Sequence, residues 1–141
     1  MIAISCQYDD SFAPVADLTV PIMREYCERH GYKLLLNVNQ PITRSIVWDR
    51  YEIILENLKY YDWICHMDAD VLVTNMNIRL EEFTEITNRN IIISRATTES
   101  GHKRFNDGVC LFKNTDYCRM MLEDVWSMPD DDFVKCGQDA L

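Results

Sequence analysis

The sequence lacks three features that would each point to a class of protein. It has no apolar stretch of about 18 residues, the length of a membrane-spanning helix, so we expect no membrane span. Its first residues, Met1 to Cys6, have neither a basic region nor a long apolar core, and they predict a buried strand instead of a signal peptide. None of its six cysteines forms a C-x-x-C pair, which argues against a zinc knuckle or a dithiol redox site.

The cysteines are scattered along the chain, and several lie within apolar runs, where a free thiol behaves as a small hydrophobic group. This pattern is typical of a reducing compartment, and we expect a cytoplasmic protein.

Basic residues are also scarce, with 14 Lys and Arg against 23 Asp and Glu, which gives a net charge of −9. Phosphate backbones would be repelled, so nucleic-acid binding is disfavoured. An anionic nucleotide could bind such a chain only through a bridging cation. The length of 141 residues, with 48% hydrophobic and 26% charged residues, predicts one folded domain, 1–141.

Hydrophobic periodicity divides the chain into alternating strands and helices. Strands are expected at Ile2–Ser5, Lys33–Val38, Asp62–Met67, Ile91–Ser94 and Gly108–Lys113, and helices at 16–30, 48–60, 78–86 and Thr115–Met128. Gly31 suits the end of the first helix, and Thr115 or Asn114 suits the start of the last. This alternation predicts an α/β fold with a mostly parallel sheet flanked by helices.

The most informative segment is the predicted strand that ends in Asp68-Ala69-Asp70, between two apolar runs. Because side chains of a strand alternate, the two carboxylates would point the same way at the strand end. That end is where α/β sheets bind ligands, and two hard oxygen ligands can hold Mn2+ or Mg2+. The alternative is a pair of solvated carboxylates in a turn.

Several segments together resemble the galactosyl-, mannosyl- and xylosyltransferase family of glycosyltransferases with the GT-A fold. The matching segments occur in family order and are His30-Gly31-Tyr32-Lys33, Trp48-Asp49-Arg50, Tyr61 to Ile64 leading into Asp68-Ala69-Asp70, Asn106 to Asn114, Trp126, and Gln138-Asp139-Ala140-Leu141. The resemblance implies a GT-A-like (Rossmann-like) domain, a UDP- or GDP-sugar donor, a divalent cation, a glycan or other hydroxyl acceptor, and retention at the anomeric carbon.

The chain also departs from this family. Gly137 stands where the family often has an acidic residue, and the family continues beyond Leu141 into acceptor-site residues. We therefore expect a domain that lacks its C-terminal acceptor-side portion, and poor sugar transfer by the chain as it stands. Eukaryotic members carry an N-terminal membrane anchor, so the direct start at a strand favours a bacterial or viral origin.

The resemblance assigns candidate roles at the donor site. Asp70 would hold the metal, and Asp68 would hold it directly or through water, or would reach the ribose. Arg50 could pair with a donor phosphate, or be an ordinary surface Arg. Gln7, Tyr8 and Asp9 follow the first strand, where a base and ribose would lie, and Tyr8 could stack on the base or simply cover the core.

Further candidates concern the sugar. Asn106 or Asp107 could bond sugar hydroxyls, and Gly108 would permit close backbone approach to the donor, although a plain turn before a strand explains this tripeptide too. Gln138 and Asp139 are the candidate catalytic residues, either stabilising positive charge at the anomeric carbon or acting as nucleophile. They could also be a polar helix start. His66 should face the same way as Asp68, and a hydrogen-bonded core histidine is favoured over a metal ligand.

Two other functions remain open. A phosphatase of the haloacid dehalogenase type also has an apolar strand ending in D-x-D, with Asp68 as nucleophile and Asp70 as acid/base. Against it, that motif normally opens the fold, and no later Gly-Asp-x-x-x-Asp motif follows here. The other possibility is a non-catalytic module that binds nucleotide sugars.

Overall fold

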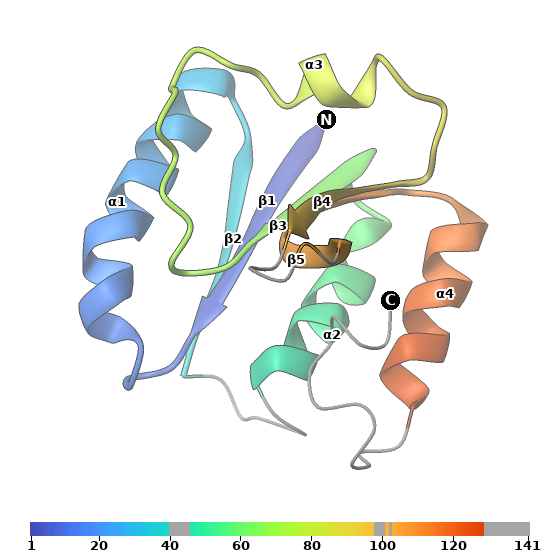
Figure 1. Ribbon diagram of the computed structural model, residues 1–141, viewed down its shortest axis with the longest axis horizontal. Coiled ribbons are helices and arrows are strands. Elements are labelled where there is room, and N and C mark those ends of the chain that lie inside the picture. Colours follow the sequence, from blue (N-terminus) through green and yellow to red (C-terminus); the bar gives the residue numbers. More distant parts are fainter. Residues whose placement is uncertain (40–45, 98–100, 102, 129–141) are drawn as a thin grey trace.

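The computed structural model describes residues 1–39, 46–97, 101 and 103–128. In chain order, the elements are β1 (Ile2–Tyr8), α1 (Ala13–His30), β2 (Lys33–Val38), α2 (Ile46–Leu58), β3 (Trp63–Met67), α3 (Glu81–Thr84), β4 (Ile91–Thr97), β5 (Lys103–Lys113) and α4 (Asp116–Ser127). The expected alternation of strands and helices is therefore confirmed, and Figure 1 shows helices on both faces of the central sheet. In the part of the chain described, no helix is long and apolar enough to cross a membrane.

The sheet has five strands in the order β2-β1-β3-β5-β4. The strand β1 pairs in parallel with both β2 and β3, whereas β5 is antiparallel to β3 and to β4. Four strands thus run in one direction and β5 runs against them, so the sheet is mixed, with mostly parallel strand directions. The carboxyl ends of β1, β3 and β4 meet at one edge of the sheet.

Two apolar cores pack on opposite faces of this sheet. One lies between the sheet and α1 and includes Ile4, Met23 and Cys65. The other lies under α2 and α4 and includes Ile54, Ile64 and Leu122. Alternate residues of β1 and β3 feed the two cores, as the period of two in a strand requires.

The helix ends follow the predicted signals. Gly31 ends α1 in the left-handed conformation (φ 73°), which glycine adopts without steric cost. Thr115 caps α4, because its side chain accepts a hydrogen bond from the backbone N–H of Cys118. The helix α1 begins earlier than predicted, because Pro14 is tolerated in a first turn, where N–H groups have no partner in the helix.

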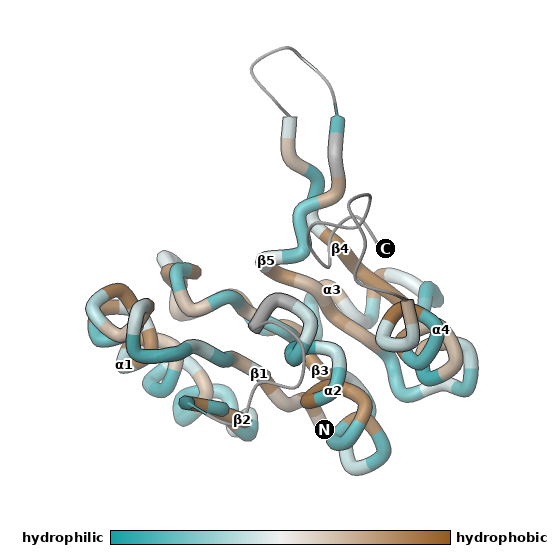
Figure 2. The backbone as a smooth tube through the Cα atoms, turned by 90° about the horizontal axis from the view of Figure 1, so that it is seen from below, coloured by the Kyte–Doolittle hydropathy of each residue, from teal (hydrophilic) through white to brown (hydrophobic). Residues whose placement is uncertain are grey.

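The strand β5 is longer than predicted. The sequence suggested a turn at Asn106-Asp107-Gly108 before a strand, but this tripeptide lies inside β5. Its pairing with β4 jumps from Ile93–Cys110 to Ser94–Asn106, so three residues of β5 bulge out of the β4 ladder. Figure 2 shows the outer parts of β4 and β5 projecting away from the rest of the molecule.

The segment after β3 contains no strand among residues 71–80, in agreement with the strands expected from the sequence. Polar contacts hold it against α1: Tyr26 Oη donates to the carbonyl of Ile78 (2.7 Å), and His30 Nε2 lies 2.9 Å from the carbonyl of Met76. The short helix predicted at 78–86 is reduced to Glu81–Thr84. These contacts hold residues 76–78, and nearer to Asp70 the hydroxyl of Thr19 in α1 donates to the carbonyl of Ala69.

Candidate donor site

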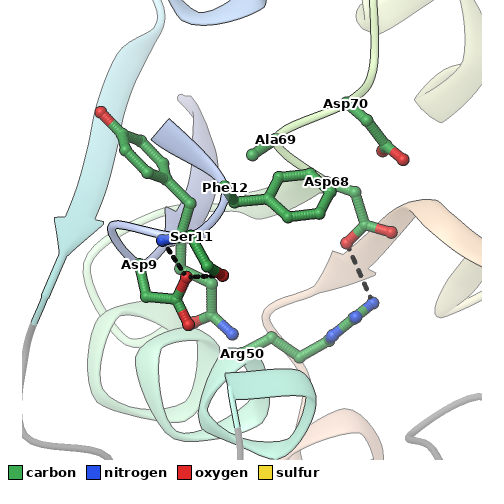
Figure 3. A pocket seen from close by; sticks show the side chains of 9 residues that line it. Asp9, Ser11, Phe12, Arg50, Asp68, Ala69 and Asp70 are labelled. Carbon is green, nitrogen blue, oxygen red and sulfur yellow. Dashed lines mark hydrogen bonds and ion pairs between the residues drawn. The ribbon is translucent and has the colours of Figure 1, made fainter. Parts of the chain in front are cut away.

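A pocket of about 210 Å³ opens at the carboxyl ends of β1 and β3. It is lined by Gln7, Tyr8, Asp9, Ser11, Phe12, Arg50, Asp68, Ala69 and Asp70 (Figure 3). Six of these were candidate site residues from the sequence: Gln7, Tyr8, Asp9, Arg50, Asp68 and Asp70. They come from three separate segments, and the parallel pairing of β1 with β3 brings two of those segments together.

The loop after β1 forms one wall of the pocket. Asp9 Oδ1 accepts hydrogen bonds from the backbone N–H and the hydroxyl of Ser11, at 2.9 and 2.5 Å. These bonds hold the pKa of Asp9 below its ordinary value, so its carboxylate is charged. Phe12 follows at the start of α1 and is partly exposed. This wall therefore presents aromatic surface beside a fixed carboxylate.

Arg50 forms the opposite wall and is buried, contrary to the alternative of an ordinary surface Arg. Its Nη1 lies 3.2 Å from Asp68 Oδ1 and 3.3 Å from Asp107 Oδ2. Figure 3 shows Arg50 reaching from α2 toward Asp68. A single guanidinium thus bridges two carboxylates, one directly after β3 and one within β5.

His66 lies behind Asp68, on the same face of β3, as the strand alternation predicted. Its Nε2 is 3.1 Å from Asp68 Oδ1 and its Nδ1 is 3.2 Å from the hydroxyl of Ser5. Burial lowers the pKa of His66, although the hydrogen bond with Asp68 opposes this effect. Burial alone would raise the pKa of Asp68, but the hydrogen bond from His66 and the charge of Arg50 outweigh it, so the pKa of Asp68 is lowered. Asp68 is a carboxylate at neutral pH.

Gly108 leaves room for this carboxylate. A Cβ on Gly108 would lie 3.1 Å from Asp68 Oδ2 and 3.2 Å from Asn106 Oδ1, which is tighter than ordinary contacts. The carbonyl of Gly108 also accepts a 2.9 Å bond from the backbone N–H of Asp68. The group that approaches Gly108 closely is therefore Asp68, while an approach of the donor to Gly108 stays a prediction.

The other two members of the tripeptide lie apart from the pocket. Asp107 is buried against Arg50, while Asn106 is exposed and accepts from the backbone N–H of Gly108 at 3.2 Å. Of the described residues that line the pocket, none comes from β5. A contact with a sugar hydroxyl stays a prediction for both residues.

The carboxylates of Asp68 and Asp70 suit a hard divalent cation. In the described part of the chain, no group of three His, Cys, Asp or Glu side chains is arranged to hold a metal ion. Mg2+, however, is usually bound through one or two carboxylates together with substrate phosphates and water. Asp68 and Asp70 supply two carboxylates on the lining of one pocket, so the donor set fits such an ion.

The candidate catalytic residues Gln138 and Asp139 lie outside the described residues, as does Cys136. The other five cysteines are free and buried, and burial raises the pKa of Cys6 and Cys110 to about 12. They act as apolar core residues, as expected.

Sequence reasoning missed Ser11, Phe12 and the partner Ser5. The first two immediately follow Gln7, Tyr8 and Asp9, so extending that segment into the start of the helix would have found them. Ser5 carries no local signal, because its contact with His66 depends on the register of two strands.

Several solved structures share the fold, and three of them are compared with this chain. A glycosyltransferase involved in glycosylation of the major capsid of PBCV-1 is 22% identical, with a TM-score of 0.73 over 93% of this chain and 67% of that chain. The galactosyltransferase LgtC, solved with donor and acceptor sugar analogues, is 16% identical, with a TM-score of 0.61 over 99% of this chain and 69% of that chain. The Drosophila β1,4-galactosyltransferase 7, solved with manganese, UDP-Gal and xylobiose, is 19% identical, with a TM-score of 0.55 over 85% of this chain and 51% of that chain.

These identities establish the GT-A-type fold alone. No sequence among curated proteins matches the chain. The family model of the galactosyl transferase GMA12/MNN10 family matches residues 13–99. This range includes the elements α1 to β4, with Asp68 and Asp70 between them. The match covers more than half of the chain, and the chain belongs to this glycosyltransferase family.

Proposed function

We propose that the pocket binds a nucleoside-diphosphate sugar, with UDP or GDP as the nucleotide, and that the protein transfers its hexose or pentose to a glycan or other hydroxyl acceptor. The observation that carries the proposal is the convergence of Gln7, Tyr8, Asp9, Arg50, Asp68 and Asp70 on one pocket at the carboxyl edge of the sheet. Family membership supports the reaction class.

The transfer depends on a divalent cation, Mn2+ or Mg2+, held by Asp70 and by Asp68 directly or through water. When bound, such an ion neutralises the charge that develops on the leaving diphosphate. Support comes from charge: a chain of net charge −9 with two carboxylates in the pocket would otherwise repel a diphosphate. A manganese-bound structure among the fold neighbours is consistent with this requirement.

The loop after β1 suits the nucleoside. Tyr8 and Phe12 offer aromatic faces on which a base can stack, and Asp9 offers an ionised acceptor for ribose hydroxyls. Gln7 adds an amide that can donate to and accept from a base. The nucleoside would therefore lie along β1 and its phosphates toward Asp68 and Asp70.

Arg50 stays a candidate partner for a donor phosphate, and its geometry gives it a second role. Its charge faces Asp68 and Asp107 at 3.2 and 3.3 Å, so we assign it to holding Asp68 in place beside the diphosphate. Retention at the anomeric carbon, with Gln138 or Asp139 supporting positive charge there, remains our prediction from the family resemblance.

A thermal-shift screen tests the proposal. Because a ligand that binds only the folded state stabilises it by RT ln(1 + [L]/Kd), UDP- and GDP-sugars should raise Tm with Mn2+ present and much less without it. CMP-sugars serve as the comparison. No shift with any nucleotide sugar would contradict the proposal.

Two activity assays separate the alternatives. Metal-dependent hydrolysis of, or transfer from, the nucleotide sugar identified in the screen would support a glycosyltransferase. Turnover of p-nitrophenyl phosphate in its place would identify a phosphatase with Asp68 as nucleophile. Binding without either reaction is the result expected for a nucleotide-sugar-binding module, and equally for a transferase domain that lacks its acceptor side.

A further inference from the structure

A buried chain of hydrogen bonds lies directly beneath the pocket. Ser5 in β1 and His66 in β3 are register partners on adjacent parallel strands, and both side chains are almost fully buried. Ser5 Oγ lies 3.2 Å from His66 Nδ1, and His66 Nε2 lies 3.1 Å from Asp68 Oδ1. The chain therefore ends on one oxygen of a pocket carboxylate.

The core does not need a histidine at this position. On the same face, the neighbouring side chains Ile64 and Cys110 are apolar and buried. Burying an imidazole costs free energy unless both ring nitrogens find partners, and an apolar residue of similar volume would carry no such cost. The partners that His66 does find are Ser5 and Asp68. A histidine at this position is therefore better explained by its hydrogen bond with Asp68 than by the packing of the core.

The two oxygens of Asp68 have different surroundings. Oδ1 accepts from His66 and from Arg50, whose Nη1 is 3.2 Å away. Oδ2 faces Gly108, where a Cβ would come within 3.1 Å. The backbone N–H of Asp68 is fixed as well, by the carbonyl of Gly108. The carboxylate is thus held in one orientation, with Oδ1 bonded to His66 and Arg50 and Oδ2 packed beside Gly108.

We propose that His66 is a positioning residue that fixes the Asp68 carboxylate for the metal and the donor, and that Ser5 in turn orients the His66 ring. Ionised Asp68 can only accept, so His66 Nε2 must carry the hydrogen of this bond. Nδ1 then accepts from the hydroxyl of Ser5, which selects this tautomer and holds the ring plane. Histidines and carboxylates at metal sites are commonly oriented by such outer hydrogen bonds. The inference rests on the proposed donor site.

Two substitutions at position 66 separate the effect of losing the hydrogen-bond donor from the effect of a smaller side chain. In His66→Gln, the amide nitrogen reaches about as far as Nε2 and can still donate to Asp68. In His66→Asn, the amide nitrogen reaches only about as far as Nδ1, so it can meet Ser5 but not Asp68. Both residues are polar and smaller than histidine, so they form a matched pair.

Calorimetric titration with UDP and with GDP, each with and without saturating MnCl2, measures the effect. Loss of an outer-shell partner typically weakens metal affinity roughly 10- to 100-fold. His66→Asn should therefore weaken the Mn2+-dependent nucleotide affinity at least about tenfold, and His66→Gln should largely restore it. Circular dichroism confirms that each variant is folded, and Ser5→Ala should weaken the affinity less than His66→Asn does.

A second measurement needs no variant. In the 15N spectrum of the imidazole rings of the wild-type protein, Nε2 of His66 should be protonated and Nδ1 should not. The opposite tautomer would overturn the inference. So would His66→Asn with wild-type affinity, or equal losses in the Asn and Gln variants. If the wild-type protein itself binds neither nucleotide with Mn2+, the proposed function fails, which is a distinguishable result.

Discussion

The two faces of the sheet use the same strands differently. On the face toward α1, β1 and β3 contribute Ile4, Cys6, Cys65 and Met67, which form a continuous apolar core. On the face toward α2, the next residues along the same strands become polar near the carboxyl edge, with Ser5 and His66 leading to Asp68. Arg50 covers this polar end. Adjacent residues of one strand therefore serve either the core or the site.

The face toward α1 contributes mainly stability, and the polar end of the other face contributes mainly to the pocket. Apolar burial contributes about 25 cal/mol per Å², whereas a buried ion pair recovers little beyond its desolvation cost. The α1 face is accordingly the main source of stability at this edge. The ion pairs of Arg50 with Asp68 and Asp107 bring little net stability, so their presence is better explained by the pocket that they border.

Removing Arg50 should have the largest effect on stability. Arg50→Leu leaves Asp107 buried and Asp68 half-buried without their common partner, and breaking a buried pair typically costs about 3–5 kcal/mol. Urea unfolding of the variant and the wild type measures the loss. A loss below about 1 kcal/mol would show that the polar network is solvated like a surface pair.

The double variant Arg50→Leu/Asp107→Leu sharpens this test. If the cost comes from the uncompensated Asp107 carboxylate, the double variant should be more stable than Arg50→Leu alone. A double-mutant cycle with Asp107→Leu gives the coupling between the two residues. Strict additivity would contradict the ion pair.

A conservative change on the α1 face should have a smaller effect. Ile4→Val removes one methylene from a fully buried site and should cost about 0.5–1.5 kcal/mol without changing nucleotide affinity. Ile64→Val, also fully buried but under α2, is the matched control. A changed nucleotide affinity in Ile4→Val would mean that the two faces are not separable.

The smallest expected effect lies at Glu52 in α2. Burial and the nearby Glu56 and Asp49 raise the pKa of Glu52, so its charged form is disfavoured in the folded state. Glu52→Gln should therefore stabilise the protein at neutral pH, by about 0.2–0.5 kcal/mol for each like-charge pair relieved. The gain should vanish below the ordinary pKa of a glutamate, where Glu52 is protonated in both states. Thermal melts across this pH range measure it, and an unchanged Tm at pH 7 would contradict the repulsion.

Most of the fold could be predicted from periodicity and from end signals such as Gly31 and Thr115. The reversal of β5 and its bulge at Asp107 could not, because pairing and register depend on contacts between strands distant in sequence. The hydrogen bonds from α1 side chains that hold the loop after β3 could not be predicted either, for the same reason.

The pocket could be predicted in part for the same reason. Polar residues directly after an apolar run indicate the end of a strand, and this signal found Gln7, Tyr8, Asp9, Asp68 and Asp70. The burial of Arg50, and its sharing between Asp68 and Asp107, depends on how α2 packs against the sheet. No spacing in the sequence encodes that distance.

The central claim is that Asp70 binds the divalent cation through which the nucleotide binds to the protein. Calorimetry of Asp70→Asn with the nucleotide that binds the wild-type protein, with and without Mn2+, tests it most directly, and Asp124→Asn, an exposed change on α4, is the matched control. The account predicts that Asp70→Asn abolishes the Mn2+-dependent binding while its melting curve stays that of a folded protein, and that the control binds normally. Unchanged Mn2+-dependent affinity in Asp70→Asn would contradict the account.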